Sequence, residues 1–308
     1  MSEDDVMKHK PLKRLQRFTP LPLLLLLSLF GCDYDHGIDP IPYRIKGTVI
    51  FDNVVPPGYV REARIAVAKR FPPENLAADL IYSDPLQFNR DTLRAQPDTL
   101  HYELVVDPGN YPAAGVLWRK SGASWDIANI LGIYGIDFSS GSLTPKPIVI
   151  NNNRPIVDSV NVYASWELTK RDAIVEGDIA FKGEWPQGPE GTEIVALAFF
   201  PIIPKTQLDF LSVKALDINV PLFRQEPFHY RTAVGSGDYK FIALFWKGKK
   251  TSIFDIRTVG FYHCSNDSLQ PRSLQVGPNE TKSGINFTVD FSTLPAGVNF
   301  RKDGGDCQ

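Results

Sequence analysis

The sequence predicts an all-β protein with two tandem antiparallel β-sandwich domains. Three observations predict this class: apolar residues alternate with polar ones in short runs, turn-forming residues separate those runs, and the second half of the chain repeats the first. The composition agrees, because 23 Gly and 25 Pro accompany 19 Phe and 11 Tyr, whereas Met occurs only twice. Aromatic residues favour strands, and Gly and Pro favour the turns between them.

The composition also excludes some classes of protein. The chain has 308 residues, of which 43% are hydrophobic and 22% are charged, as in globular rather than disordered proteins. Its 33 Lys and Arg are balanced by 35 Asp and Glu, and no basic run follows residue 17. Because a nucleic-acid-binding domain normally carries a basic patch, we expect no nucleic acid among the partners.

The first 31 residues are typical of a signal peptide. Five basic residues precede an apolar run over 21–30, which is half as long as a membrane-spanning helix of about 20 residues. The segment Leu29-Phe30-Gly31-Cys32 resembles a bacterial lipobox, whose Cys becomes the lipidated N-terminus. The alternative is an ordinary secretory signal that ends on a chance Cys.

The lipobox predicts a lipid-anchored protein of the bacterial cell envelope. Acyl chains on Cys32 would attach the protein durably to a membrane. The residues that follow, with Asp33, Asp35 and Asp39, predict an acidic tether over 32–42. Asp33 beside the anchor resembles the inner-membrane retention signal of enteric bacteria, whereas the acidic segment resembles a surface-export signal of Bacteroidota. Both the inner and the outer membrane stay open.

An internal repeat divides the rest of the chain. Residues 45–51 match residues 175–181, and residues 65–68 match residues 195–198, both at an offset of 130. Later pairs follow at an offset of 128: 101–102 with 229–230, 109–111 with 237–239, Trp118 with Trp246, and 132–134 with 260–262. The repeat predicts one domain over 43–168, a second over 172–294, and a polar C-terminal tail over 295–308.

Period-two patterns predict the strands of each repeat. Apolar or inward residues alternate with polar ones over 229–234 and over 285–291, as in strands that are buried on one face. Over 239–246 both sets of alternate positions are mostly apolar, which indicates a central strand with Tyr239 and Phe241 on one face and Trp246 on the other. Only residues 73–80 and 205–213 have patterns that allow short helices.

These elements resemble a known family. The order aliphatic-x-Gly-x-aliphatic-x-Phe, aliphatic-x-aliphatic, and Tyr-x-aliphatic followed by Gly-x-Tyr occurs over 45–51, 65–67 and 102–111, and again over 175–181, 195–197 and 230–239. This order is similar to that of the prealbumin-like or carboxypeptidase regulatory-like (transthyretin-like) sandwich. The resemblance implies a β-sandwich fold and a role as an accessory or binding module.

Catalytic and metal-binding signatures do not emerge from the sequence. His101 and His229 each precede an inward Tyr on an alternating strand, so we expect both to point to solvent. The pair His263-Cys264 lacks a second ligand pair at zinc-site spacing. We find no Gly-x-Ser-x-Gly, Ser-x-x-Lys or His-Glu-x-x-His segment. We therefore expect no enzyme activity, no cofactor and no metal.

Aromatic residues are the candidates for ligand contact. Trp125, Tyr134 and Tyr262 lie in the second half of each repeat beside polar residues, as in many sugar-binding and peptide-binding sites. Trp118 and Trp246 are better explained as packing. Cys264 and Cys307 are the remaining thiols after Cys32, and two outcomes stay open: a disulfide that fixes the tail, or a loose tail with Cys264 buried as a thiol.

Three functional hypotheses follow. The first is a non-catalytic, lipid-anchored envelope protein whose sandwiches bind another envelope protein. The second is a glycan-binding lipoprotein for polysaccharide capture, which depends on the aromatic residues. The third is a hydrolase of unknown class, which requires His101 or His229 to lie in a cleft with a carboxylate within hydrogen-bond reach.

Overall fold

The computed structural model describes residues 42–52, 54–71, 73, 75–90, 98–136, 144–187, 191–220, 226–249, 256–294, 296–303 and 307. It divides the chain into Met1–Ile41 and the compact unit Pro42–Gln308. The expected signal peptide, Cys32 and all but the last residue of the expected tether lie outside the described residues.

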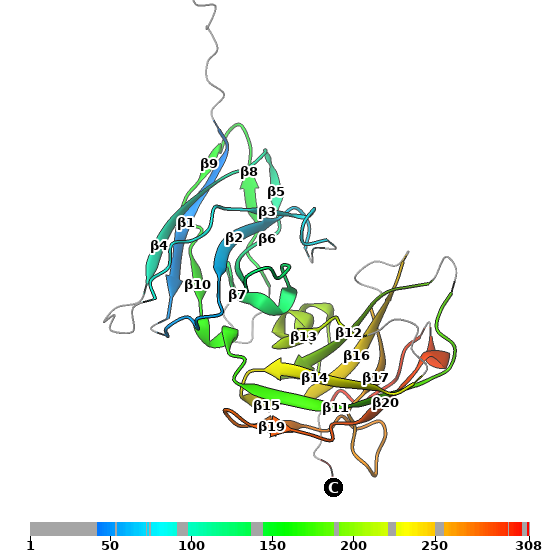
Figure 1. The fold of residues 1–308 in the computed structure, drawn as a ribbon. Helices are drawn as coiled ribbons and strands as arrows, with labels where there is room; N and C mark the ends of the chain where they lie inside the picture. Colours follow the sequence, from blue (N-terminus) through cyan, green and yellow to red (C-terminus); the bar gives the residue numbers. More distant parts are fainter. Residues whose placement is uncertain are drawn as a thin grey trace, which may run out of the picture. The chain divides into compact units, whose positions relative to one another are not determined.

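The described residues of the first repeat form ten strands in three sheets, and Figure 1 labels the strands. The two main sheets have the orders β10-β1-β4, with β9 beside β1, and β3-β2-β6-β7, while β5 and β8 form a small third sheet. The strands are β1 (Arg44–Phe51), β2 (Glu62–Ala68), β3 (Leu80–Tyr82), β4 (Thr99–Val105), β5 (Gly109–Tyr111), β6 (Ala113–Arg119), β7 (Ile130–Ile133), β8 (Ile148–Ile150), β9 (Ile156–Val157) and β10 (Val162–Ala164).

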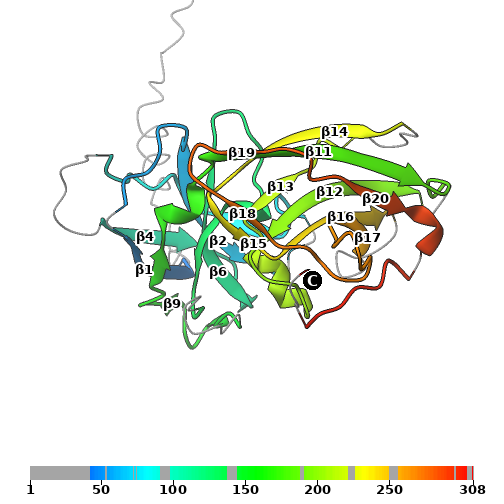
Figure 2. The same ribbon diagram turned by 90° about the horizontal axis from the view of Figure 1, so that it is seen from below.

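The second repeat has the same arrangement. Its main sheets have the orders β14-β11-β19, with β20 beside β11, and β13-β12-β16-β17, and Figure 2 shows these two layers. The strands are β11 (Ala173–Lys182), β12 (Thr192–Phe200), β13 (Ala215–Asp217), β14 (Phe228–Val234), β15 (Gly237–Tyr239), β16 (Phe241–Gly248), β17 (Arg257–Phe261), β18 (Leu274–Val276), β19 (Thr281–Lys282) and β20 (Phe287–Asp290).

The all-β fold class is confirmed, and the helices within the described residues are short 3-10 turns. These are η1 (Ile127–Asn129), η2 (Trp166–Thr169), η4 (Gln207–Ser212) and η6 (Phe291–Thr293). The pattern over 205–213 therefore gives one 3-10 segment. Residues 76–78, within the other candidate helix, form a hydrogen-bonded turn.

The sheets are not wholly antiparallel. In each repeat the first strand pairs in parallel with the last strands: β1 with β9 and β10, and β11 with β19 and β20. The remaining strand pairs in both repeats are antiparallel. These parallel pairs join the first strand of each repeat to the last strands of the same repeat.

The strand registers identify equivalent residues in the two repeats. Gly47 lies opposite Tyr102, as Gly177 lies opposite Tyr230. The predicted match of residues 65–68 with residues 195–198 is wrong, because the strand register places residues 65–68 at 197–200, two residues further along. Ala66 and Gly115 are partners in β2 and β6, whereas Ala198 and Ala243 are partners in β12 and β16. The equivalent offset in these strands is therefore 132, because the second repeat has two more residues before this strand.

Each repeat has its own core between its two main sheets. In the first repeat the core includes Phe51, Trp118 and Trp166, and Phe51 stacks on Trp166 with ring centroids 4.4 Å apart. In the second repeat Trp246 is buried and donates from its indole nitrogen to Thr192 Oγ1 at 2.9 Å. Trp118 and Trp246 are thus packing residues, as the sequence predicted.

The segment that joins the repeats is held by specific contacts. The Tyr59 hydroxyl donates a hydrogen bond to the carbonyl oxygen of Thr169. The Arg171 guanidinium lies 5.6 Å from the centre of the Trp118 ring. Asp172 accepts hydrogen bonds from the backbone and the hydroxyl of Ser236. Burial lowers the pKa of Arg171.

Candidate interaction site

The sheet β3-β2-β6-β7 carries apolar side chains on both faces, and at one end of its outer face also charged ones. Side chains alternate along β6, so that Val116 and Trp118 enter the core while Ala113 and Leu117 lie on the outer face. At one end of this outer face the β2 partners are small, since Ala68 lies opposite Ala113 and Ala66 opposite Gly115, whereas at the other end Arg64 lies opposite Leu117 and Glu62 opposite Arg119. The outer face is therefore apolar, with short side chains, only at the end that holds Ala68 and Ala113.

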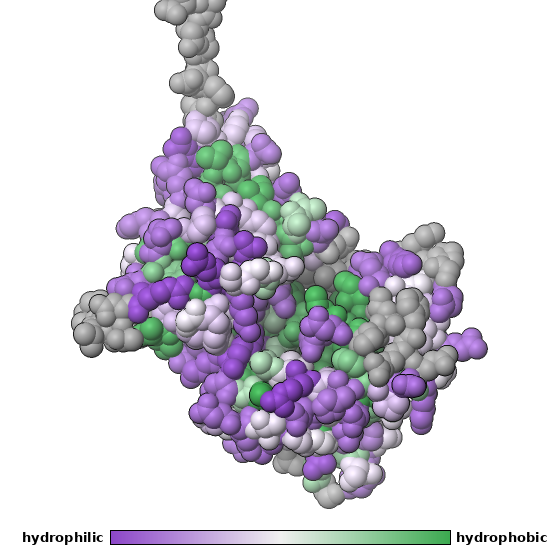
Figure 3. Space-filling model, in the orientation of Figure 1, coloured by the Kyte–Doolittle hydropathy of each residue, from purple (hydrophilic) through white to green (hydrophobic). Residues whose placement is uncertain are grey.

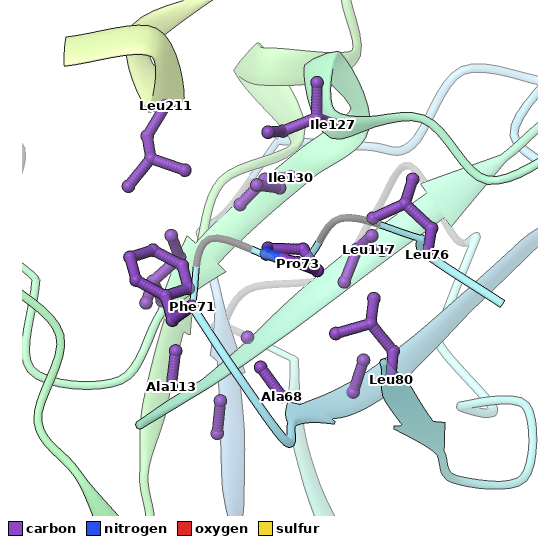
Figure 4. A pocket seen from close by; sticks show the side chains of 14 residues that line it. Ala68, Phe71, Pro73, Leu76, Leu80, Ala113, Leu117, Ile127, Ile130 and Leu211 are labelled. Carbon is purple, nitrogen blue, oxygen red and sulfur yellow. The ribbon is translucent and has the colours of Figure 1, made fainter. Parts of the chain in front are cut away.

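A pocket lies over these short side chains (Figure 4). All 14 residues that line it are apolar, and they include Ala68, Phe71, Leu76, Ala113, Ile130 and Leu211. The space that the centre of a water molecule can occupy is about 50 Å³. At about 10 to 15 Å³ per water on this measure, the space matches roughly one aliphatic or aromatic side chain and is too small for a sugar ring. We call it the outer-face pocket.

The second repeat fills the equivalent place with its own aromatic side chains. Phe200 and Phe241 are cross-strand partners where the first repeat has Ala68 and Ala113. Phe200 packs edge-on against Phe210 of η4, with ring centroids 5.6 Å apart. The difference in side-chain volume explains why the pocket forms in the first repeat.

The C-terminal tail covers this face of the second repeat. The Phe300 ring lies 4.7 Å from that of Phe241 and 5.6 Å from that of Phe261. The residues equivalent to Phe241 and Phe261 in the first repeat are Ala113 and Ile133, and both line the outer-face pocket. The first repeat thus has smaller side chains where the second repeat packs a Phe side chain, and the pocket over them is bounded by Phe71, Leu76 and, from η4 of the second repeat, Leu211.

A disulfide joins Cys264, which is fully buried, to Cys307 at the end of that tail, with 5.5 Å between their Cα atoms. The tail is also held by backbone hydrogen bonds from Val298 to Thr258 and from Arg301 to Leu269, each 2.8 Å long. The expected lipidation site, Cys32, lies outside the described residues. Within the described part of the chain, no helix is both long and apolar enough to cross a bilayer.

The structure places the three candidate aromatic residues in three different clusters. Trp125 packs on the outer face of the first repeat, where Tyr82 stacks on it at 5.0 Å and the Arg119 guanidinium lies 4.7 Å from its ring centre. Tyr134 packs against the first core, and Tyr262 is buried in the second. No shared site brings these rings together. Sequence reasoning missed the outer-face pocket, whose only signal is a run of small residues at 113–115.

The two equivalent histidines point to solvent, as expected. His101 Nδ1 lies 3.4 Å from Thr48 Oγ1, and His229 Nδ1 lies 3.1 Å from a carboxylate oxygen of Asp178. The His229 and Asp178 side chains are 63% and 54% exposed, so this pair lies on an open strand face and not in a cleft. Among the described residues, no group of three or more His, Cys, Asp or Glu is placed to bind a metal ion.

Most of the surface in Figure 3 is hydrophilic, with hydrophobic side chains gathered over β8 and β9. Val149 of β8 and Ile156 of β9 are 46% and 40% exposed, and Val105 of β4 is 60% exposed. Val105 and Ile156 both lie beside Arg44 across β1. This apolar surface is therefore at the end of the first sandwich where the chain enters it.

Comparisons with known proteins show only distant likenesses. No protein-family model matches the chain, and no curated protein matches it. Among solved structures, a leucine-rich repeat protein from Bacteroides thetaiotaomicron is similar at a TM-score of 0.27 and 9% identity, over 80% of this chain and 26% of that one. A Bacillus anthracis TIE protein gives a TM-score of 0.18 and 8% identity, over 80% and 34%. This chain thus spans about a quarter and a third of these two proteins.

A minor pilin from Streptococcus agalactiae is similar at a TM-score of 0.21 and 8% identity, over 80% of this chain and 96% of the pilin. At these TM-scores and identities, none of the likenesses assigns a function to this chain.

Proposed function

We propose that this protein is a non-catalytic, lipid-anchored component of the bacterial cell envelope that binds another envelope protein through its first sandwich. The single observation that carries the proposal is the outer-face pocket. The second repeat fills the same face with Phe200, Phe241 and Phe300, whereas the first repeat has Ala68 and Ala113 there and leaves a pocket bounded by Phe71, Leu76 and Leu211 of the second repeat.

The occupant that fits is one large apolar side chain of a partner protein. Phe300 shows what such an occupant does, because its ring packs against Phe241 and Phe261 on this face of the second repeat. Burying a Phe or Leu side chain contributes about 1.5 to 3 kcal/mol, which is enough for an anchor residue in a larger interface. The lining offers no hydrogen-bonding side chain, so the pocket does not suit a sugar.

A photo-crosslinking experiment tests the proposal in the source organism. A benzophenone amino acid replaces Leu76 at the pocket, and in a second strain it replaces Leu269, a 46% exposed residue of the second repeat, as the matched control. We expect a discrete adduct from position 76 and none from position 269. The adduct should disappear when Ala113→Phe is added, because the new ring fills the pocket as Phe241 does in the second repeat.

Circular dichroism and urea unfolding must show that the Ala113→Phe protein is folded, and Ala68→Leu serves as a second filling variant. An adduct that persists in both folded variants, or that forms equally from position 269, would contradict the proposal. The absence of any adduct from position 76 in living cells would contradict it as well.

A further inference from the structure

A second surface of the first sandwich has a different chemistry. A groove at the start of β2 is lined by Arg61, Glu62, Arg64, residues 85–88 and Arg90. We call it the basic groove. It shares no residue with the outer-face pocket and does not depend on the function proposed for that pocket.

Three arginines and a single acidic residue line this groove. Glu62 binds Arg64 and also accepts from Arg119 Nε at 2.8 Å, so its charge is already compensated. Burial raises the pKa of Glu62, but the hydrogen bonds from the two arginines outweigh burial and hold the pKa below its ordinary value. Glu62 is therefore ionised at neutral pH, and the groove keeps a net positive charge.

Two of the arginines are differently placed. Arg90 donates to the carbonyl oxygen of Val60 and its guanidinium lies 4.8 Å from the centre of the Phe88 ring, which fixes it at the groove. Arg61 is exposed, and its guanidinium makes no ion pair or hydrogen bond with the described part of the chain. The guanidinium N–H groups of Arg61 are thus available to donate two parallel hydrogen bonds to a carboxylate or a sulfate.

The second repeat provides an internal comparison. By the strand register, Ile194 and Ala196 occupy the places of Glu62 and Arg64, and Glu193 precedes them. Glu193 there forms an ion pair with Lys247. The positive groove is therefore a property of the first repeat and not of the fold.

The groove lies at the end of the sandwich away from Pro42. Phe88 of the groove and Phe51, the last residue of β1, both pack on Trp166. The eight residues of β1 span about 26 Å at roughly 3.3 Å per residue. The groove therefore lies about one strand length from Arg44, the first residue of β1.

We infer that the basic groove binds an acidic polysaccharide through guanidinium contacts to its carboxylate or sulfate groups. Arginine forks match both groups in geometry. The exposed side chain of Pro85 supplies apolar surface for the C–H face of a sugar ring, and the exposed Gln87 amide can hydrogen-bond to hydroxyl groups. This mixture suits a charged and hydroxylated polymer better than an acidic peptide.

Affinity electrophoresis and calorimetry on the detergent-solubilised full-length protein test the inference. The probes are polygalacturonate for carboxylate, dextran sulfate for sulfate, neutral dextran, and poly-L-glutamate. We expect at least one acidic polysaccharide to bind and neutral dextran not to bind. Arg61→Glu should weaken binding about tenfold or more, since one charge-assisted hydrogen bond contributes about 1.5 to 3 kcal/mol.

The matched control is Lys240→Glu, which makes the same charge change at an exposed position of the second repeat. Its affinity should equal that of the unmodified protein, and Arg61→Lys should bind with intermediate affinity. Failure of both acidic polysaccharides to bind, an equal loss in Lys240→Glu, or tighter binding of poly-L-glutamate than of either polysaccharide would overturn the inference. None of these outcomes depends on the crosslink from position 76.

Discussion

The hydroxyl of Tyr102 donates a hydrogen bond of 2.7 Å to the carbonyl oxygen of Val160. This contact links β4 to the segment before β10 across β1, where Gly47 lies between them. The second repeat has the same bond, because Tyr230 donates to Ile285 at 2.7 Å beside Gly177. The Gly and the Tyr of the sequence repeat therefore act together: the Gly leaves room for the backbone carbonyl to approach, and the Tyr hydroxyl donates a hydrogen bond to that carbonyl.

The first prediction concerns the space at Gly47. A Cβ atom there would lie 2.1 Å from the carbonyl oxygen of Val160, whereas a Cβ at Gly58 would meet nothing within 4 Å. We expect Gly47→Ala to lower the free energy of unfolding by about 2 kcal/mol or more, and Gly58→Ala to change it by less than about 0.5 kcal/mol. Urea unfolding measures both, and equal stability of the two variants would contradict the account of Gly47.

The second prediction concerns the hydroxyl itself. Burial raises the pKa of Tyr102, so the group is a protonated donor at neutral pH. Tyr102→Phe removes the donor from a buried carbonyl, and we expect a loss of about 1 to 3 kcal/mol. Tyr163→Phe is the control, because that side chain is 74% exposed. If the two variants unfold at the same urea concentration, the hydrogen bond does not stabilise the sandwich.

The strands that carry this Gly and this Tyr could be predicted from the sequence, because the alternation of apolar residues and the repeated Gly and Tyr are local patterns. The pattern could not predict where the chain changes sheet. Tyr239 and Phe241 were expected on one face, but Tyr239 ends β15 in the core and Phe241 begins β16 on the outer face. The Lys240 amide donates to Phe200 at this change, a long-range contact that no local pattern contains.

The outer-face pocket was also beyond prediction from the sequence. Ala68 and Ala113 meet only because β2 and β6 pair in that register, and their repeat partners differ from the sequence match by two residues. The basic groove likewise joins Arg61 to Arg90, which a loop of intervening residues separates. Both sites depend on which strands become neighbours.

The third prediction concerns membrane attachment. Cys32→Ser should leave the protein in the soluble fraction or as an unprocessed precursor, because a serine cannot carry the thioether-linked lipid. Fractionation and intact-mass measurement of the two proteins decide this. Cys307→Ser is the control and should stay in the membrane fraction. Unchanged membrane partition of Cys32→Ser would contradict the lipobox prediction.

The fourth prediction concerns the pair Cys264 and Cys307, which are joined in the structure. Closing a loop of 43 residues contributes about 3 to 4 kcal/mol in the chain-entropy model. We expect non-reducing mass spectrometry to find the two cysteines in one linked peptide pair, and Cys307→Ser to unfold at lower urea. Recovery of both as free thiols from protein purified without reductant would show that the tail is held by Phe300 and its hydrogen bonds alone.

The last prediction concerns the pH dependence that Glu62 contributes. Its pKa in the folded protein is below the ordinary value of 4.5, because the hydrogen bonds from Arg119 and Arg64 outweigh burial. A depressed pKa stabilises the fold above the unfolded pKa, and this contribution is lost as the pH falls through the folded pKa. Glu62→Gln should therefore be less stable than the unmodified protein by about 1 kcal/mol at pH 7, and the difference should shrink below pH 4.5.

Glu184→Gln, at an exposed position, should show no such difference at either pH. Urea unfolding at pH 7 and pH 3.5 distinguishes the two, and a Glu62→Gln deficit that stays constant with pH would mean that lost packing, not charge, is responsible.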